Sequence, residues 1–262
     1  MKSSTSIIQS ISAQQKQIAV LIDPEKSQDE KRLNELLQKC EFAGVDFIFI
    51  GGSTVTRQQF EKTASYIKST TKIPLVIFPG SSQQLSNDAD ALLYLSLLSG
   101  RNPDFLIGHH IQSALELNEM NLEIIPTGYL LIDGGTQSSV AYVSQTTPIP
   151  RHNLTAVKQI ALAAKFQGKQ LIYMDAGSGA LHCVPNEMIQ MVKKLNLPLI
   201  VGGGIRSIEH LKEIHDAGAN IAVIGNKLES DIEFLLELHS YKKKLVNKIE
   251  QIEYDHGQKK YF

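Results

Sequence analysis

The sequence has 262 residues, of which 42% are hydrophobic and 20% are charged, with a formal net charge of -1 at pH 7. This length suits one large globular domain or two small ones, and the near-zero charge provides no basic field that would recruit nucleic acid. Neither of the two cysteines, Cys40 and Cys183, belongs to a C-x-x-C pair, so we expect a reducing, cytoplasmic location.

No targeting or membrane-spanning segment is predicted. The first residues, MKSSTSIIQSISAQQKQ, contain no continuous apolar stretch of the kind that a signal peptide needs. The most apolar run, ALLYLSLL at 91–98, is much shorter than the roughly 20 residues that cross a bilayer. We therefore expect at most a peripheral contact with a membrane.

Short apolar runs alternate with helical patterns along the chain. The runs that we predict to be strands are 17–23, 45–53, 74–80, 91–98, 122–133, 169–175, 197–205 and 220–226. Eight such strands predict a parallel sheet closed into a (β/α)8 TIM-type barrel, with residues 1–262 forming one domain. A doubly wound open sheet is the alternative, but eight units in one domain favour the barrel.

Capping residues mark where most of the intervening helices begin. The expected starts are a capping box at Ser27 and Glu30, another at Thr56 and Gln59, then Asn153, Pro185, Ser207 and a last box at Ser230 and Glu233. The pattern at 103–120 is also helical, whereas 134–152 is expected to be a long irregular loop. The last helix is expected to run toward Lys242–Lys244, a solvated lysine cluster.

One connection departs from this alternation. The segment at 81–90, SSQQLSNDAD, is polar and has no helical stripe, and the next apolar run starts near Ala91. A crossover between parallel strands usually needs at least about 10 to 12 residues. We therefore expect the third helix to be missing or replaced by an extended stretch.

Glycine-rich loops follow the last three predicted strands. Gly177-Ser178-Gly179 follows strand six, Gly203 and Gly204 follow strand seven, and Gly225-Asn226 follows strand eight. Barrels often bind phosphate at this position, because glycine lets several backbone N–H groups point at one anion. Ser178 can add a hydroxyl and Asn226 a side-chain amide. The alternative is that these glycines only make tight turns.

Two further groups of polar residues lie at predicted strand ends. Asp175 cannot bind phosphate but can accept a proton or hydrogen bond from a hydroxyl on the same ligand, and Tyr173 shares its side of the strand. Tyr173 can equally be a buried aromatic. Asp23 and Ser53, on neighbouring strands, suit Mg²⁺, although Asp23 with Pro24 can also be only a turn. For His109 and His110 we favour helix surface or packing over metal binding.

Six segments resemble the geranylgeranylglyceryl phosphate synthase family, including its heptaprenylglyceryl phosphate synthase relatives. They are LIDPEK, FIGGST, IFPGS, YMDAGSGA, LIVGGGIRS and VIGN, in the family's order between about residues 20 and 226. The resemblance implies a modified barrel without a regular third helix. It also implies transfer of a geranylgeranyl or similar prenyl group from its diphosphate to the C3 hydroxyl of sn-glycerol 1-phosphate, a step of phospholipid biosynthesis.

The resemblance also implies roles for particular residues. The Mg²⁺ ligands of the family match Asp23 and Ser53. Its glycerol phosphate positions match Tyr173, Asp175, Gly177–Gly179, Gly203, Gly204, Gly225 and Asn226. Where the family usually has glutamate this chain has Asp175, whose carboxylate is shorter by about one carbon–carbon bond. Family members assemble, so we expect a homo-oligomer.

Two other functions remain open on the sequence alone. One is an isomerase or aldolase acting on a sugar phosphate, which would usually need a second strong acid or base or a Schiff-base lysine at a strand end. No such lysine is found at an apolar strand end. The other is a non-catalytic barrel that binds a phosphorylated ligand, an idea supported only by Asp175 in place of glutamate.

Overall fold

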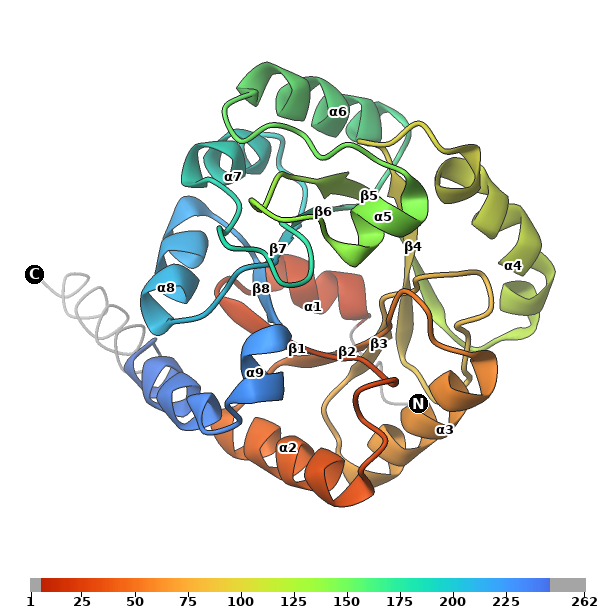
Figure 1. Ribbon diagram of the computed structural model, residues 1–262, viewed down its shortest axis with the longest axis vertical. Helices are drawn as coiled ribbons and strands as arrows, with labels where there is room; N and C mark the ends of the chain where they lie inside the picture. Colours follow the sequence, from red (N-terminus) through yellow and green to blue (C-terminus); the bar gives the residue numbers. More distant parts are fainter. Residues whose placement is uncertain (1–5, 246–262) are drawn as a thin grey trace, which may run out of the picture.

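The chain folds as a parallel β-barrel surrounded by helices (Figure 1). The structure, a computed structural model, describes residues 6–245, so both ends of the domain predicted for 1–262 lie outside the described residues. The barrel closes in chain order, with β8 paired to β1. The strands are β1 (Gln17–Ile22), β2 (Phe47–Ile50), β3 (Leu75–Ile77), β4 (Ala91–Leu97), β5 (Glu123–Leu131), β6 (Leu171–Asp175), β7 (Leu199–Gly202) and β8 (Ile221–Ile224). The predicted barrel is confirmed.

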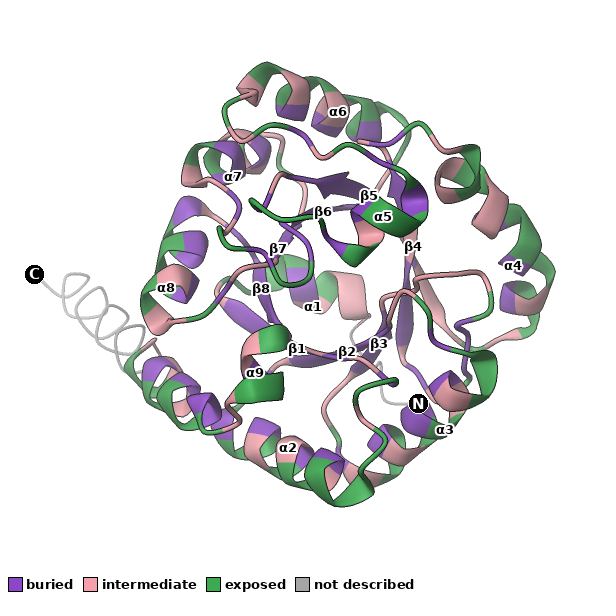
Figure 2. Cartoon of the chain, in the orientation of Figure 1, coloured by how far each residue is buried: buried purple, intermediate pink, exposed green. Residues whose placement is uncertain are grey.

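Helices form the outer layer and two covers at the ends of the barrel. They are α1 (Ile7–Ala13), α2 (Glu30–Ala43), α3 (Arg57–Thr70), η1 (Asp104–Gly108), α4 (His109–Glu119), α5 (Ser139–Ser144), α6 (Leu154–Phe166), α7 (Asn186–Lys193), α8 (Ile208–Ala217) and α9 (Asn226–Ser230), with a further helix at 234–245. Along the helices of the outer ring, buried positions recur on the side that faces the barrel (Figure 2). No helix among residues 6–245 has both the length and the apolar character needed to cross a bilayer.

Alternate residues of each strand enter two different cores. In β6, Leu171 and Tyr173 belong to the core inside the barrel, whereas Ile172 and Met174 pack against the helices. This alternation follows from the two-residue period of a strand. It places Asp175, the last residue of β6, on the same side as Tyr173, toward the barrel interior.

The amino-terminal end of the barrel is closed by α1 (Figure 1). Ile11 is fully buried in the interior core. The side chain of Glu123 accepts the N–H groups of Ile7 and Ile8, the latter at 3.0 Å, and so satisfies donors that the first turn of a helix leaves unpaired. The carboxyl-terminal ends of the strands are left as the open end.

The outer ring is interrupted between β3 and β4, as predicted. Residues 78–90 contain no helix, and β3 pairs with β4 at only two positions. Gln84, fully buried, holds this segment in place: its Nε2 donates to Gly52 O at 2.7 Å and its Oε1 accepts from Gly80 N at 2.9 Å. An extended segment therefore takes the place of the third helix.

Most predicted helix boundaries are confirmed, including the capping box of Thr56 and Gln59. Two predicted capping boxes are wrong. Asp29, not Ser27, caps α2 by accepting from Lys31 N at 2.9 Å. Ser230 ends α9 instead of starting the last helix.

The remaining differences concern the segment after β5 and the last helix. The region predicted as an irregular loop, 134–152, contains α5, which lies over the barrel opening (Figure 1). Lys242 is not simply solvated, because its ammonium pairs with Asp46 at 2.6 Å and fastens the last helix to the barrel.

Candidate active site

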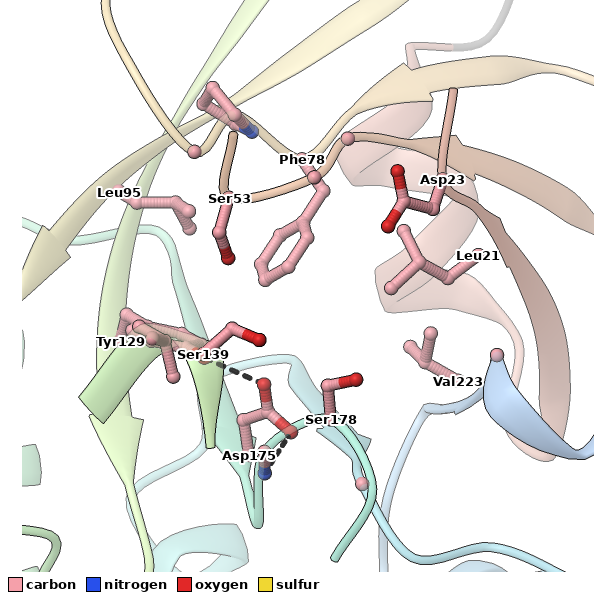
Figure 3. A pocket seen from close by; sticks show the side chains of 18 of the residues that line it. Leu21, Asp23, Ser53, Phe78, Leu95, Tyr129, Ser139, Asp175, Ser178 and Val223 are labelled. Carbon is pink, nitrogen blue, oxygen red and sulfur yellow. Dashed lines mark hydrogen bonds between the residues drawn. The ribbon is translucent and has the colours of Figure 1, made fainter. Parts of the chain in front are cut away.

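One cavity of about 570 Å³ lies at the carboxyl-terminal ends of the strands. All the residues predicted for the site line it, namely Asp23, Ser53, Tyr173, Asp175, Gly177, Ser178, Gly179, Gly203, Gly204, Gly225 and Asn226. Figure 3 shows Asp175 and Ser178 on one side of the cavity and Asp23 and Ser53 on the other. The structure thus brings together residues that are up to 203 positions apart.

Asp175 is buried and fixed by two hydrogen bonds (Figure 3). Its Oδ1 accepts from Gly177 N at 2.7 Å and its Oδ2 accepts from the hydroxyl of Tyr129 at 2.6 Å. Burial raises the pKa of Asp175 above that of an ordinary carboxyl group, and the two hydrogen bonds oppose this shift. The result is a carboxylate of fixed orientation and increased basicity, which suits a general base.

Tyr129 was not predicted from the sequence. It lies on β5 directly beside Tyr173 of β6, and the two rings meet edge to face with centroids 5.4 Å apart. Burial and the neighbouring Asp175 raise the pKa of Tyr129 well above its usual value, so the phenol keeps its proton and remains a donor. Its inward position next to the strand that carries Asp175 was the signal that could have identified it.

Tyr173 combines the two roles left open for it. Its ring is buried and packs edge-on against Phe78 at 5.0 Å, which makes it part of the barrel core. Its hydroxyl lies close to Gly202, where an added Cβ would come within 2.6 Å of it. No hydrogen bond to this hydroxyl is found among residues 6–245, so it can serve a ligand.

The glycine loops after β6 and β7 have the geometry that the sequence predicted. Gly177 and Gly203 have φ values of 89° and 85°, in the left-handed region that favours glycine. A Cβ on Gly203 would come within 2.7 Å of Gly177 N and 2.8 Å of Asp175 Oδ1, so the two loops pack without room for a side chain. We call Gly177, Ser178 and Gly179, with the adjoining Gly203 and Gly204, the glycine cup.

The side chain of Asn226 already occupies part of the glycine cup. Its Oδ1 accepts from Gly179 N at 2.9 Å and from the hydroxyl of Ser178 at 3.2 Å. The sequence predicted that Asn226 would add a side-chain amide to the phosphate site. In the structure the oxygen of this amide faces the cup.

Asp23 has features expected of a cation ligand. Partial burial raises the pKa of Asp23, while the backbone N–H of Glu25 and the charge of Lys26 oppose this. A Cβ at Gly52 would come within 2.7 Å of Asp23 Oδ1, so the glycine leaves this carboxylate room. Residues 6–245 hold no group of three His, Cys, Asp or Glu side chains that could bind a metal. A single carboxylate, with the Ser53 hydroxyl lining the same cavity, is compatible with Mg²⁺, which keeps waters and substrate phosphates among its ligands.

The opposite arm of the cavity is mainly apolar. It is lined by Leu85, Leu92, Leu95, Leu97 and Phe105, contributed by the helix-free segment, β4 and η1. This arm lies beside the extended segment that takes the place of the third helix.

The two histidines of α4 belong to this arm. His110 stacks on Tyr94 with centroids 3.8 Å apart, and its Nε2 lies 2.7 Å from Leu95 O. His109 packs edge-on against Phe105. Both rings therefore pack against aromatic side chains, as expected.

The sequence model of the PcrB family matches residues 11–242. This chain belongs to the PcrB family. Among its relatives, this PcrB-family chain is 48% identical over 225 residues to the geranylgeranylglyceryl phosphate synthase of Zunongwangia profunda, covering 86% of this chain and 95% of that one. It is 38% identical over 229 residues to the synthase of the same name from Korarchaeum cryptofilum, covering 87% and 93%.

A solved structure agrees with the family relationship. The PcrB-family barrel superimposes with a TM-score of 0.84 on the crystal structure of (S)-3-O-geranylgeranylglyceryl phosphate synthase from Thermoplasma acidophilum in complex with its substrate sn-glycerol-1-phosphate. The two chains are 34% identical, and the match covers 90% of this chain and 96% of that one.

Proposed function

We propose that this chain is a prenyltransferase that joins a geranylgeranyl or similar prenyl group to the C3 hydroxyl of sn-glycerol 1-phosphate. The observation that carries the proposal is the placement of Asp175. Its buried carboxylate is fixed at the edge of the glycine cup, in a cavity whose other arm is apolar. The names of the relatives and the substrate of the Thermoplasma acidophilum enzyme support this reaction.

In this proposal, the glycine cup holds the phosphate of sn-glycerol 1-phosphate through backbone N–H groups. Asp175 accepts the proton of the C3 hydroxyl, and Tyr129 keeps the carboxylate turned toward it. The hydroxyl oxygen then forms a bond to C1 of the prenyl group as the bond from C1 to the diphosphate oxygen breaks. The tail lies in the apolar arm, which shields the developing allylic cation from water.

We further propose that Asp23 and Ser53 hold Mg²⁺. The bound ion would neutralise the diphosphate as it leaves. Asp23→Asn should then raise the Mg²⁺ concentration needed for half-maximal activity, measured by titrating the purified chain after treatment with a chelator. An Mg²⁺ response identical to that of the unchanged chain would argue against this ligand.

The decisive experiment is a product assay. The purified chain receives Mg²⁺ and geranylgeranyl diphosphate with either sn-glycerol 1-phosphate or its sn-3 enantiomer, and shorter and longer prenyl diphosphates are tested in parallel. An ether-linked prenylglyceryl phosphate formed only from the sn-1 compound is the expected result. Glycerol phosphate binding without product at any prenyl length would overturn the catalytic proposal.

The proposal extends to a homo-oligomer in the cytoplasm. Ile107, Ile111 and Leu115 lie four residues apart and are 52%, 70% and 86% exposed, so they form an apolar stripe on η1 and α4. Light scattering on the chain and on Ile111→Glu tests this assembly. We expect the variant to have a smaller mass, and a monomeric unchanged chain would refute the idea.

A further inference from the structure

A chain of hydrogen bonds crosses the mouth of the cavity, from the glycine cup to the loop after β1. Asn226 Oδ1 accepts from Gly179 N and from the Ser178 hydroxyl. Asn226 Nδ2 donates to Glu229 Oε1 at 3.3 Å. Lys26 Nζ donates to both carboxylate oxygens of Glu229, at 3.0 Å and 2.9 Å. Neither Glu229 nor Lys26 has a role in the function proposed above.

The partners on either side determine which way the Asn226 amide faces. The backbone N–H of Gly179 can only donate, so it requires the amide oxygen on its side. The carboxylate of Glu229 can only accept, so it requires the amide NH2 on the other side. The two constraints agree, and together they turn the amide oxygen into the glycine cup.

This orientation competes with a phosphate. A phosphate oxygen bound to Gly179 N would take the donor that now bonds to Asn226 Oδ1, and two oxygen acceptors placed side by side repel each other. Turning the amide over removes the conflict and gives the phosphate an N–H donor. The turned amide then points its oxygen at Glu229, which would be unfavourable without another donor.

Lys26 can supply that donor. Its ammonium group and Asn226 Nδ2 are bonded to the same oxygen, Glu229 Oε1, so the ammonium group lies next to the amide. An ammonium group has three N–H donors, and it can bond to the turned Asn226 oxygen while keeping Glu229. The pair therefore offers an acceptor for one orientation of the amide and a donor for the other.

We propose that Glu229 and Lys26 are positioning residues that set the orientation of the Asn226 amide and thereby the affinity of the glycine cup for phosphate. Glu229 favours the orientation in which the Asn226 oxygen faces the cup, and Lys26 favours the orientation in which the Asn226 NH2 faces it. The inference rests on the proposed function in one respect, since it takes the phosphate of sn-glycerol 1-phosphate as the ligand of the cup.

The test compares binding of sn-glycerol 1-phosphate by calorimetry in four forms of the full chain: unchanged, Glu229→Gln, Asn226→Ala and the double variant. A glutamine at 229 can donate or accept, so it no longer favours the closed orientation. We expect Glu229→Gln to bind about 3- to 10-fold more tightly when Asn226 is present, and nearly without change when it is absent. Glu35→Gln, which removes an exposed partner of Lys39 on α2, is the matched control and should leave binding unchanged.

A charge effect acting through space would give a different pattern. Removing a negative charge near the cup would then tighten binding by the same factor with or without Asn226, and that outcome overturns the proposal. Unchanged or weaker binding by Glu229→Gln in the presence of Asn226 overturns it as well. Lys26→Met should weaken binding about 10-fold. Unchanged binding by this variant would contradict the role proposed for Lys26.

Inorganic phosphate separates this inference from the proposed function. The turn of the amide responds to the phosphate group alone, so the same four forms should give the same ratios with inorganic phosphate. If those ratios appear but sn-glycerol 1-phosphate does not bind, the positioning role stands and the proposed substrate falls. If neither compound binds the unchanged chain, both fail.

Discussion

The strand β8 has an asparagine near each end, and the two have opposite surroundings. Asn220, at the closed end, is 3% exposed; its Nδ2 donates to Ile11 O at 3.1 Å and its Oδ1 accepts from Leu199 N at 3.1 Å. Asn226, at the open end, is exposed and bonded to Ser178, Gly179 and Glu229. Asn220 therefore bonds buried backbone groups of the barrel. Asn226 instead bonds groups that line the cavity.

This difference indicates that polar side chains at the closed end serve stability and those at the open end serve function. At the closed end, buried polar side chains satisfy backbone groups that water cannot reach, so their loss should cost stability. At the open end, polar groups border a cavity, so their loss should affect binding or turnover. Four measurements test this division.

The largest effect should come from Asp175 at the open end. Asp175→Asn should lower turnover by about 10²- to 10⁴-fold, the usual contribution of a general base, while binding of sn-glycerol 1-phosphate stays within about an order of magnitude. Since burial raises the pKa of Asp175, activity should also decline as the pH falls through a value above the usual carboxyl pKa. Steady-state rates and calorimetry measure both.

The same substitution at the closed end is the control. Asp90 Oδ2 accepts from Leu75 N at 2.8 Å, far from the proposed chemistry. Asp90→Asn should leave turnover unchanged. Full turnover in Asp175→Asn would rule out the base.

At the closed end, Asn220→Ala should lower the free energy of unfolding by about 2 to 4 kcal/mol, because it leaves buried backbone groups without partners. The affinity for sn-glycerol 1-phosphate should not change in the folded protein. Urea unfolding at pH 7 measures the loss. A stable variant with weakened binding would reverse the assignment of the two ends.

His215 gives the closed end a pH dependence. It lies buried between Gln17 O and the Tyr241 hydroxyl, each 3.0 Å away, and burial lowers its pKa to about 4. In the unfolded chain its pKa is about 6.5, so the unfolded state gains a proton first as the pH falls.

The stability that neutral His215 provides is therefore complete above about pH 6.5 and is lost as the pH falls toward 4, by up to about 3 kcal/mol. Urea unfolding across this range should show the decline, and His215→Gln should flatten it. An equally steep decline in the variant would assign the effect to other groups.

The smallest effect should come from Asn226→Ala. It should weaken phosphate binding about 10-fold, which corresponds to about 1.4 kcal/mol, and change the free energy of unfolding by less than about 0.5 kcal/mol. The same calorimetric and urea measurements apply. A loss of stability as large as that of Asn220→Ala would mean that both asparagines contribute equally to folding stability.

Local patterns in the sequence were enough to predict the barrel. The strands have apolar runs of the right length, and the caps at Thr56 and Ser207 are formed by residues within one turn of the helix they start. The missing helix was predictable because a segment too short and polar for a crossover is visible without any tertiary information. The loops of the glycine cup were predictable because φ values near 85° to 89° suit glycine.

Features that depend on contacts between distant segments were not predictable in this way. Tyr129 acquires its role from the register that sets it beside Tyr173, 44 residues along the chain. The reversed orientation of Asn226 depends on Glu229 and on the loop after β6. The helix α5 was missed because its buried side, Ala141 and Ser144, is too short to give a periodic signal.

The short pairing of β3 with β4 has a consequence for the stability of the barrel wall beside the apolar arm. These strands share two paired positions, whereas β4 and β5 share seven. The barrel wall thus has a weakly paired seam between β3 and β4, where fewer backbone hydrogen bonds hold the strands together than between β4 and β5. This seam runs beside the apolar arm. Amide hydrogens along this seam should therefore exchange with solvent before those of the more fully paired strands β4 and β5.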